Sequence, residues 1–141
     1  MTRVWMLPVL MLLCGGLVAT GEAVDGSPAE AVFSFLLFAL LAFATSPLVF
    51  PRSVGAAEAG RRAAVDGRPV VYWRPGCAYC LRLRVRLGVR GRRAHWVNIW
   101  RDAEGAAVVR GATGGDETVP TVVVGSEVRV NPDPAWVRAR L

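Results

Sequence analysis

Residues 70–80 read VVYWRPGCAYC, a β-prone run that passes through a Pro-Gly turn into a C-x-x-C pair. The run Val70–Trp73 is bounded by prolines, which predicts a short buried strand. A cysteine between a strand and a following helix lies at the helix N-terminus, where free N–H groups and the helix dipole stabilise a thiolate. Because the thiolate is the species that attacks disulfides, the stretch predicts a redox-active Cys77. Cys80, one turn further on, can then form a disulfide with it.

Zinc binding is the main alternative for this cysteine pair. A structural zinc site needs four ligands and usually contains two such pairs. The third cysteine, Cys14, stands alone in an apolar run and is expected to be inert, and the single histidine, His95, lies in a predicted apolar strand. A histidine there is more typical of a packed or edge residue than of a ligand. The spacing therefore favours redox chemistry without a metal or a bound cofactor, and a purely structural pair of buried thiols remains a further alternative.

The elements expected around the cysteine pair alternate between strand and helix. In residues 80–90, Leu and Val alternate with Arg, which by itself favours a half-buried strand, although Leu and Arg are also good helix formers. We expect a helix there, on the resemblance described below. Further elements are a strand at 94–100, a helix at about 102–111, strands at 121–124 and 127–130 joined by a tight hairpin, and a final helix from about 131. The order β-α-β-α-β-β-α predicts an α/β domain with a central sheet covered by helices.

The second signal is Thr118-Val119-Pro120-Thr121, which follows a Gly-rich loop. A proline at the start of a strand is normally only an edge or strand-start residue. Some forty residues after a C-x-x-C pair, however, it suggests the cis-proline loop that faces the active cysteines in thioredoxin folds. Such a loop presents the backbone of the preceding residue for pairing with a bound thiol substrate.

Three motifs in this order resemble glutaredoxins, and most of all mycoredoxins, which use mycothiol in place of glutathione. They are Cys77-Ala78-Tyr79-Cys80, then Gly114-Gly115 before Thr118-Val119-Pro120-Thr121, then Asn131-Pro132. The resemblance covers residues 72–132, about half of the chain. It implies a minimal thioredoxin fold and a thiol–disulfide oxidoreductase that acts on protein mixed disulfides. No cofactor would be bound, and the low-molecular-weight thiol mycothiol, or glutathione, would be the co-substrate.

The resemblance also implies roles for individual residues. Cys77 would be the attacking thiolate and Cys80 the resolving or auxiliary thiol. The groove for the small thiol would be lined by Tyr79, Val119 and Pro120, with polar contacts from Thr118 and Asp116.

Two departures from the family pattern affect the predicted partner and the predicted thiol chemistry. The Gly-Gly-x-Asp motif with which glutaredoxins bind glutathione is absent downstream, and this favours mycothiol. The turn Trp73-Arg74-Pro75-Gly76 replaces a Thr/Ser-rich turn. Within it, Arg74 either lowers the pKa of Cys77 or is a solvated turn residue, and both interpretations stay open.

The first 50 residues contain most of the apolar excess of this 141-residue, 53% hydrophobic chain. Uncharged stretches at about 4–20 and 31–50 predict two transmembrane helices, since twenty helical residues span the ~30 Å hydrocarbon core of a bilayer. A cleaved signal peptide is the alternative for the first stretch, but a second span so soon afterwards favours a hairpin. The predicted organisation is a membrane region at 1–50, a juxtamembrane linker at 51–65 and a glutaredoxin-like domain at 66–141.

The charge distribution predicts the orientation. The net charge is +6 and all 17 basic residues are Arg, which we attribute to coding bias rather than to a nucleic-acid partner. Residues 21–30 between the apolar stretches contain three acidic residues and no basic one, whereas arginines flank both outer ends. The positive-inside rule then places the C-terminal domain on the cytoplasmic side of the plasma (inner) membrane. Alternatives are a non-catalytic thioredoxin-like membrane adaptor, or an extracytoplasmic thiol oxidase or isomerase.

Overall fold

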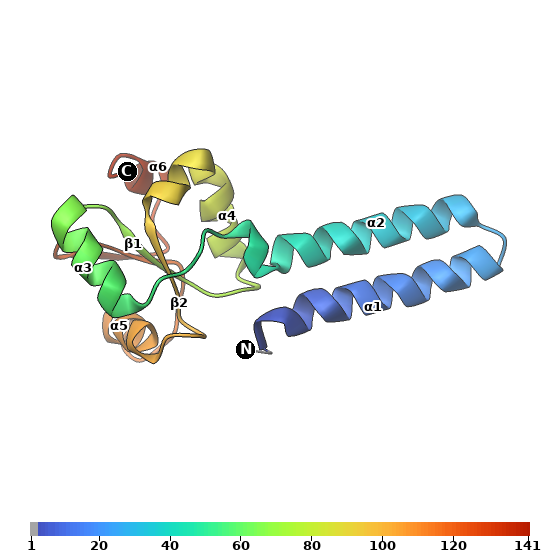
Figure 1. Cartoon of the computed structure of the whole chain (residues 1–141), viewed down its shortest axis with the longest axis horizontal. Coiled ribbons are helices and arrows are strands. Elements are labelled where there is room, and N and C mark those ends of the chain that lie inside the picture. Colours follow the sequence, from blue (N-terminus) through green and yellow to red (C-terminus); the bar gives the residue numbers. More distant parts are fainter. Residues whose placement is uncertain (1–2) are drawn as a thin grey trace. The chain divides into compact units, whose positions relative to one another are not determined.

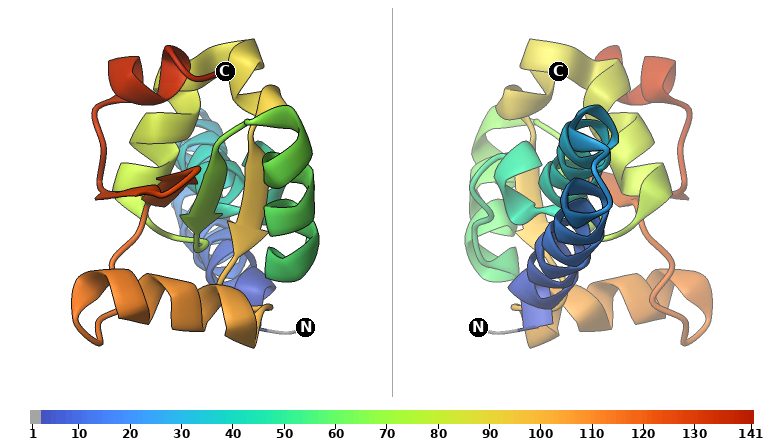
Figure 2. Two further views of the ribbon diagram at one scale, coloured as in Figure 1. Left: turned by 90° about the vertical axis from the view of Figure 1, so that its left-hand side faces the viewer. Right: turned by 90° about the vertical axis from the view of Figure 1, so that its right-hand side faces the viewer.

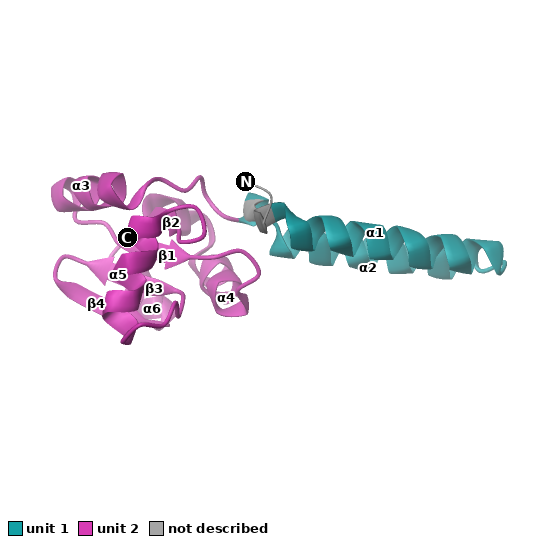
Figure 3. Ribbon diagram, turned by 90° about the horizontal axis from the view of Figure 1, so that it is seen from below, with its two compact units in different colours: residues 1–49 teal, residues 50–141 magenta. Residues whose placement is uncertain are grey.

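The computed structural model describes residues 3–141, which form two compact units, one that ends at Val49 and one that spans Phe50–Leu141 (Figure 3). Each unit is built around its own internal contacts, and each is described separately below.

The first unit is a hairpin of two long helices, α1 (Arg3–Val24) and α2 (Pro28–Thr45), followed by a short 3₁₀ turn, η1 (Pro47–Val49) (Figure 1). The spans Trp5–Val24 and Pro28–Thr45 each have a mean hydropathy of 1.8 and are long and apolar enough to cross a membrane. The second helix begins at Pro28 because proline is favoured in the first helical turn, where its missing N–H has no partner to lose. It ends at Thr45, five residues before the end of the apolar stretch 31–50.

Close packing joins the two helices of the hairpin. A Cβ added at Gly15 would lie 2.5 Å from Cβ of Phe38, whereas one added at Gly16 would meet nothing within 4 Å. Nearer the turn, the Ser34 hydroxyl donates a hydrogen bond to Oε1 of Glu22 at 3.1 Å. Of the Gly15-Gly16 pair, therefore, only Gly15 lies where a side chain would prevent the close packing of the two helices.

The second unit has a four-stranded mixed sheet in the order β2-β1-β3-β4. Strands β1 and β2 are parallel, and the other two pairings are antiparallel. The strands are β1 (Val70–Trp73), β2 (His95–Asn98), β3 (Thr121–Val124) and β4 (Glu127–Val130). The helices are α3 (Ala56–Asp66), α4 (Ala78–Leu87), η2 (Gly88–Arg93), α5 (Ala103–Thr113) and α6 (Pro134–Arg138). Helices α4 and α6 cover one face of the sheet and α3 and α5 the other (Figure 2). The predicted α/β fold with its β-α-β-α-β-β-α order is confirmed.

Residues 78–87 form a helix, although their apolar and basic residues alternate as in a strand. The side chains of Cys80, Leu83 and Leu87 are buried, and their spacing of three and four residues places them on one side of the helix. The neighbouring arginines lie on the other sides of the helix, where their aliphatic stems can cover apolar surface while the guanidinium groups reach solvent. The apparent alternation arises because Leu81 and Val85, which are not buried, are interspersed with arginines outside the buried face of the helix.

The segment 51–65, expected to be a juxtamembrane linker, is packed onto the sheet in this structure. The Phe50 ring stacks on Trp73 with centroids 3.8 Å apart. The Trp73 indole N–H donates to the hydroxyl of Ser53 at 3.1 Å, and the Val54 amide donates to the carbonyl of Trp96 at 3.0 Å. Helix α3 follows and buries small alanine side chains against the domain. The residues in each of these contacts are 20 or more positions apart in the sequence, so no local sequence pattern predicts the contacts.

Asp102 joins α3 to α5. Its Oδ1 accepts the Gly105 amide at 2.7 Å as the N-cap of α5, and its Oδ2 accepts the Ala56 amide at 2.9 Å, at the start of α3. One carboxylate therefore satisfies free N–H groups at two helix N-termini, where negative charge is also favourable.

Candidate active site

Cys77 is the N-cap of α4, between the end of β1 and the first turn of the helix. Its Sγ accepts a hydrogen bond from the Cys80 amide at 3.2 Å. The pKa of Cys77 is lowered to about 6, first by a hydrogen bond from the Cys80 thiol, then by the backbone amides of Cys80 and Tyr79, while partial burial opposes the shift. Cys77 is therefore a thiolate at neutral pH.

Cys80 is fully buried, and its pKa is raised because its thiol proton is donated to Cys77 and because burial disfavours its charged form. Both cysteines are free thiols in the structure. The pair is unequal: one sulfur carries the negative charge, and the other holds the proton that stabilises it. This is the division of labour that a nucleophile and its auxiliary thiol require.

The loop before β3 faces Cys77. The Val119–Pro120 peptide bond is cis, as predicted from the sequence. In its protonated form, the Cys77 thiol donates to the carbonyl oxygen of Val119 at 3.3 Å. That hydrogen bond exists only for the neutral thiol, so it works against the lowered pKa of Cys77. The thiolate leaves the Val119 carbonyl free to accept a donor from a substrate.

A groove of about 560 Å³ opens around Cys77. It is lined by Arg74, Gly76, Cys77, Ala78, Tyr79, Asp116, Glu117, Thr118 and Val119. Most of the residues predicted for the site thus line one groove, while Cys80 and Pro120 are buried beside it. Arg74 contributes the smallest of the effects that lower the pKa of Cys77, so most of that shift comes from hydrogen bonds.

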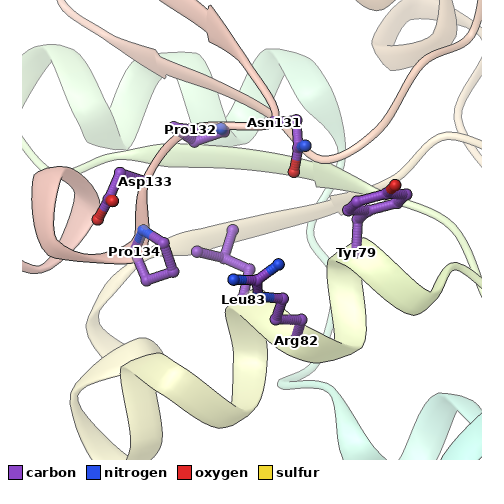
Figure 4. Close-up of a pocket in the computed structure, with 7 residues that line it drawn as sticks. All are labelled: Tyr79, Arg82, Leu83, Asn131, Pro132, Asp133 and Pro134. Atoms are coloured by element: carbon purple, nitrogen blue, oxygen red, sulfur yellow. The ribbon is translucent and has the colours of Figure 1, made fainter.

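Sequence reasoning missed a second hollow, of about 280 Å³, which shares Tyr79 with the groove around Cys77 (Figure 4). Its lining residues are Tyr79, Arg82, Leu83, Asn131, Pro132, Asp133 and Pro134. Tyr79 lines both hollows and stands at one end of this one, beside Asn131 in the view of Figure 4. The signal that could have found it is Asn131-Pro132, a motif shared with the family for which no binding role was predicted.

Asn131 ties this second hollow to the loop of the first. Its amide donates to the carbonyl of Pro120 at 2.7 Å. Its backbone has φ 47°, a left-handed conformation that asparagine tolerates better than most residues. A backbone hydrogen bond therefore links the segment that lines the second hollow to the loop that lines the first.

His95 lies at the start of β2 and approaches Asp66, with its Nε2 3.0 Å from Oδ2 of that carboxylate. Over residues 3–141, no three His, Cys, Asp or Glu side chains gather closely enough to hold a metal ion.

A C-x-x-C pair that opens the helix after β1 and faces a cis-proline before β3 defines a thioredoxin-like fold. Residues 70–129 match the family model described as Glutaredoxin, which supports a glutaredoxin-like domain in this part of the chain. Glutaredoxins act on low-molecular-weight thiols and protein disulfides, and the match supports thiol–disulfide oxidoreductase activity. No curated protein and no solved structure matches the chain.

Proposed function

We propose that the protein is a membrane-anchored thiol–disulfide oxidoreductase that reduces mixed disulfides between proteins and a low-molecular-weight thiol through Cys77. The observation that carries the proposal is the unequal cysteine pair, with a Cys77 pKa of about 6 beside a buried Cys80 whose pKa is raised. A thiolate at neutral pH is both a competent nucleophile and a good leaving group in disulfide exchange.

The reaction begins when the Cys77 thiolate attacks the small-thiol sulfur of a mixed disulfide. A new disulfide forms between Cys77 and the small thiol, and the protein sulfur leaves with the electron pair and takes a proton from solvent. A second small thiolate then attacks this disulfide, forms the oxidised small-thiol dimer and restores the Cys77 thiolate. In sum, the mixed disulfide and one free small thiol become the protein thiol and the oxidised small-thiol dimer, and Cys77 is regenerated.

Cys80 offers an alternative second step. It can lose its proton, attack Cys77 and release the small thiol, which leaves a Cys77–Cys80 disulfide to be reduced by further thiol. The main cause of its raised pKa is the hydrogen bond to Cys77. That cause disappears once Cys77 is in a mixed disulfide, and burial alone then opposes ionisation of Cys80.

The proposed groove contacts are those of Tyr79, Thr118, Val119, Asp116 and Arg74, which all line the groove around Cys77. The free Val119 carbonyl is available to accept a backbone or amide N–H of the bound thiol. Pro120, which is buried beside the groove, is proposed to complete its lining next to Val119.

Mycothiol is the proposed thiol. The second hollow offers a guanidinium from Arg82, an amide from Asn131 and a carboxylate from Asp133, a mixed set of donors and acceptors that suits the hydroxyl groups of a sugar-bearing thiol. The absence of the Gly-Gly-x-Asp motif of glutathione-dependent glutaredoxins supports the same choice.

The proposed location is the plasma membrane, with the glutaredoxin domain in the cytoplasm. The two apolar helices and the acidic turn between them support this topology, because arginines flank only the outer ends of the hairpin. A reporter fused to the C-terminus, active only in the cytoplasm, tests the orientation. Activity of a reporter that needs export would contradict it.

The enzymatic proposal is tested with the full chain in detergent and a protein carrying a mycothiol mixed disulfide. We expect Cys77→Ser to lose reduction altogether and Cys80→Ser to keep much of it if the small thiol performs the second step. Glutathione in place of mycothiol should support slower turnover. Full activity of Cys77→Ser would overturn the assignment, and inactivity of the wild type with both thiols would point to an adaptor.

A further inference from the structure

We propose that the outer face of α4, continued into η2, docks on an anionic lipid leaflet. We define this basic face as Tyr79, Arg82, Val85, Arg86, Val89, Arg90, Arg92 and Arg93. The inference rests on the membrane anchoring proposed above and adds a second, peripheral attachment of the domain itself. It concerns a surface that the redox mechanism uses only at its Tyr79 and Arg82 end.

The helical spacing builds the face. Within α4, Arg82, Val85 and Arg86 lie three and four residues apart, on the side opposite the buried Cys80, Leu83 and Leu87. The apolar members are unusually open: Tyr79 is 57% exposed, Val85 67% and Val89 78%. Basic residues around exposed apolar side chains are the composition of surfaces that lie in the membrane interface.

No carboxylate neutralises the basic face. Residues 82–93 contain six arginines and no acidic residue. In the described part of the chain, every ion pair formed by an arginine involves one outside this segment. Within it, the pKa of Arg84 is lowered first by burial and then by the nearby positive charge of Arg92.

The fold extends this charge beyond α4. The Arg138 guanidinium, from α6, donates to the backbone carbonyl of Arg86 and so brings another cation to the same end of the helix. In Figure 2, η2 and α6 lie side by side at the end of the domain where α4 stops. The basic end is therefore opposite the Cys77 end of α4.

Helix stability accounts for only part of the pattern. Arg84 and Arg86 occupy the last turn of α4, where cations interact favourably with the helix dipole. Arg90, Arg92 and Arg93 lie beyond that turn, and the dipole explains neither them nor the exposed valines. An anionic membrane surface explains both, because its headgroups attract the arginines and its interface accommodates the apolar side chains.

Lipid fits better than nucleic acid for two reasons. Single-stranded nucleic acids bind surfaces that interleave aromatic and basic side chains, and the basic face contains one aromatic residue, Tyr79, among aliphatic ones. Only residues 46–49 separate the end of α2 from Phe50, where the second unit begins. If α2 spans the bilayer, the covalent chain keeps the domain close to the headgroups. Each arginine near an anionic headgroup layer contributes about 1 kcal/mol to the free energy of binding.

The test uses the full chain in nanodiscs of phosphatidylcholine, with or without phosphatidylglycerol. Phenylglyoxal modifies accessible guanidinium groups, and mass spectrometry reads each arginine separately. We expect Arg86, Arg90, Arg92 and Arg93 to react several-fold more slowly in the anionic discs, and high salt to remove the difference. Arg101 is exposed but does not belong to the basic face, so it should react equally in both kinds of disc.

A variant with Arg86→Gln, Arg90→Gln and Arg92→Gln should lose the protection of Arg93, because each arginine contributes about a fivefold factor to docking. The matched control, Arg61→Gln with Arg62→Gln and Arg101→Gln, changes net charge equally and should keep it. Reduction of a soluble disulfide should be unaffected in both.

Equal reactivity of Arg93 in the two kinds of disc would overturn the proposal. So would protection by an added oligonucleotide in phosphatidylcholine discs, which would assign the basic face to nucleic acid. A chain that does not co-purify with discs would overturn both docking and membrane anchoring, whereas loss of activity in Cys77→Ser would show independently that the redox proposal stands.

Discussion

At the scale of single residues, the chemistry of the site depends on where one proton lies. The Cys80 thiol keeps its proton and donates it as a hydrogen bond, which is the largest cause of the lowered pKa of Cys77. Helix position alone, which the sequence indicates, is a smaller contribution. The second cysteine therefore matters to the nucleophile even in a mechanism in which it never forms a disulfide.

We expect the rate of Cys77 alkylation to rise with pH and to reach half of its maximum near pH 6. Below that pH the thiol is protonated and unreactive; above it the thiolate fraction saturates. Cys80→Ala should move the midpoint upward, toward the ordinary thiol value, because the donor is lost. Cys80→Ser keeps a hydroxyl donor and should move it less. The measurement is peptide-resolved iodoacetamide labelling of the reduced full chain in a Cys14→Ser background; equal midpoints in the two variants would contradict this explanation.

The residue roles were predictable only as far as local motifs reach. The sequence points to Cys77, Cys80 and the Val119-Pro120 loop, because each belongs to a short motif with its own chemistry. The contributions of Arg82, Asn131 and Asp133 to the second hollow depend on α4 and α6 lying side by side. No residue spacing in the sequence predicts the contact between α4 and α6.

At the scale of elements, close packing of α5 on the sheet depends on one glycine. A Cβ at Gly105 would lie 2.8 Å from Cγ1 of Val97, and 3.3 Å from Oδ1 of Asp102. We expect Gly105→Ala to destabilise the domain by about 1–3 kcal/mol through overpacking. Gly111→Ala, in the same helix but with nothing within 4 Å, should stabilise it by about 0.5–1 kcal/mol. Denaturant unfolding followed by tryptophan fluorescence measures both, and a stabilising Gly105→Ala would be inconsistent with the packing described.

The carboxylate shared by α3 and α5 provides a second test. Asp102→Ala removes hydrogen bonds from two helix N-termini and should cost about 2 kcal/mol or more of unfolding free energy. Asp133→Ala removes a single cap, at 2.6 Å from the Ala135 amide of the short α6, and should cost about 1 kcal/mol. Similar losses in the two variants would show that the contact from Asp102 to α3 contributes nothing.

Secondary structure was predicted well where the pattern was unambiguous. The strands at 70–73, 121–124 and 127–130 are found at those bounds, since prolines and a Gly-Ser turn delimit them in the sequence. The periodicity of residues 80–90 pointed to a strand, and only the family resemblance gave the helix. Helix α3 was not foreseen as part of the sheet's covering layer, because an Ala, Gly and Arg composition offers little apolar signal.

At the scale of the whole molecule, the folding unit of the second half begins at Phe50. We expect residues 50–141 to fold and to reduce a soluble disulfide like the full chain, because the unit contains its own core and both cysteines. Residues 66–141 lack the Phe50 stack on Trp73 and nearly all of α3, and should be less stable by about 3 kcal/mol or more. Thermal unfolding of the two fragments measures the difference; equal stability would show that residues 50–65 contribute nothing to the stability of the domain.

The hydrogen bond from the Asn131 amide to the Pro120 carbonyl has a thermodynamic consequence. It connects the hollow beside Tyr79 to the loop whose Val119 carbonyl meets Cys77. A ligand in that hollow that binds more tightly when Cys77 is a thiolate must raise the acid dissociation constant of Cys77 by the same factor and so lower its pKa, since linkage between two sites is reciprocal. The affinity of the hollow for such a ligand then varies with pH around 6. One coupling free energy describes both the binding of the small thiol and the ionisation of Cys77.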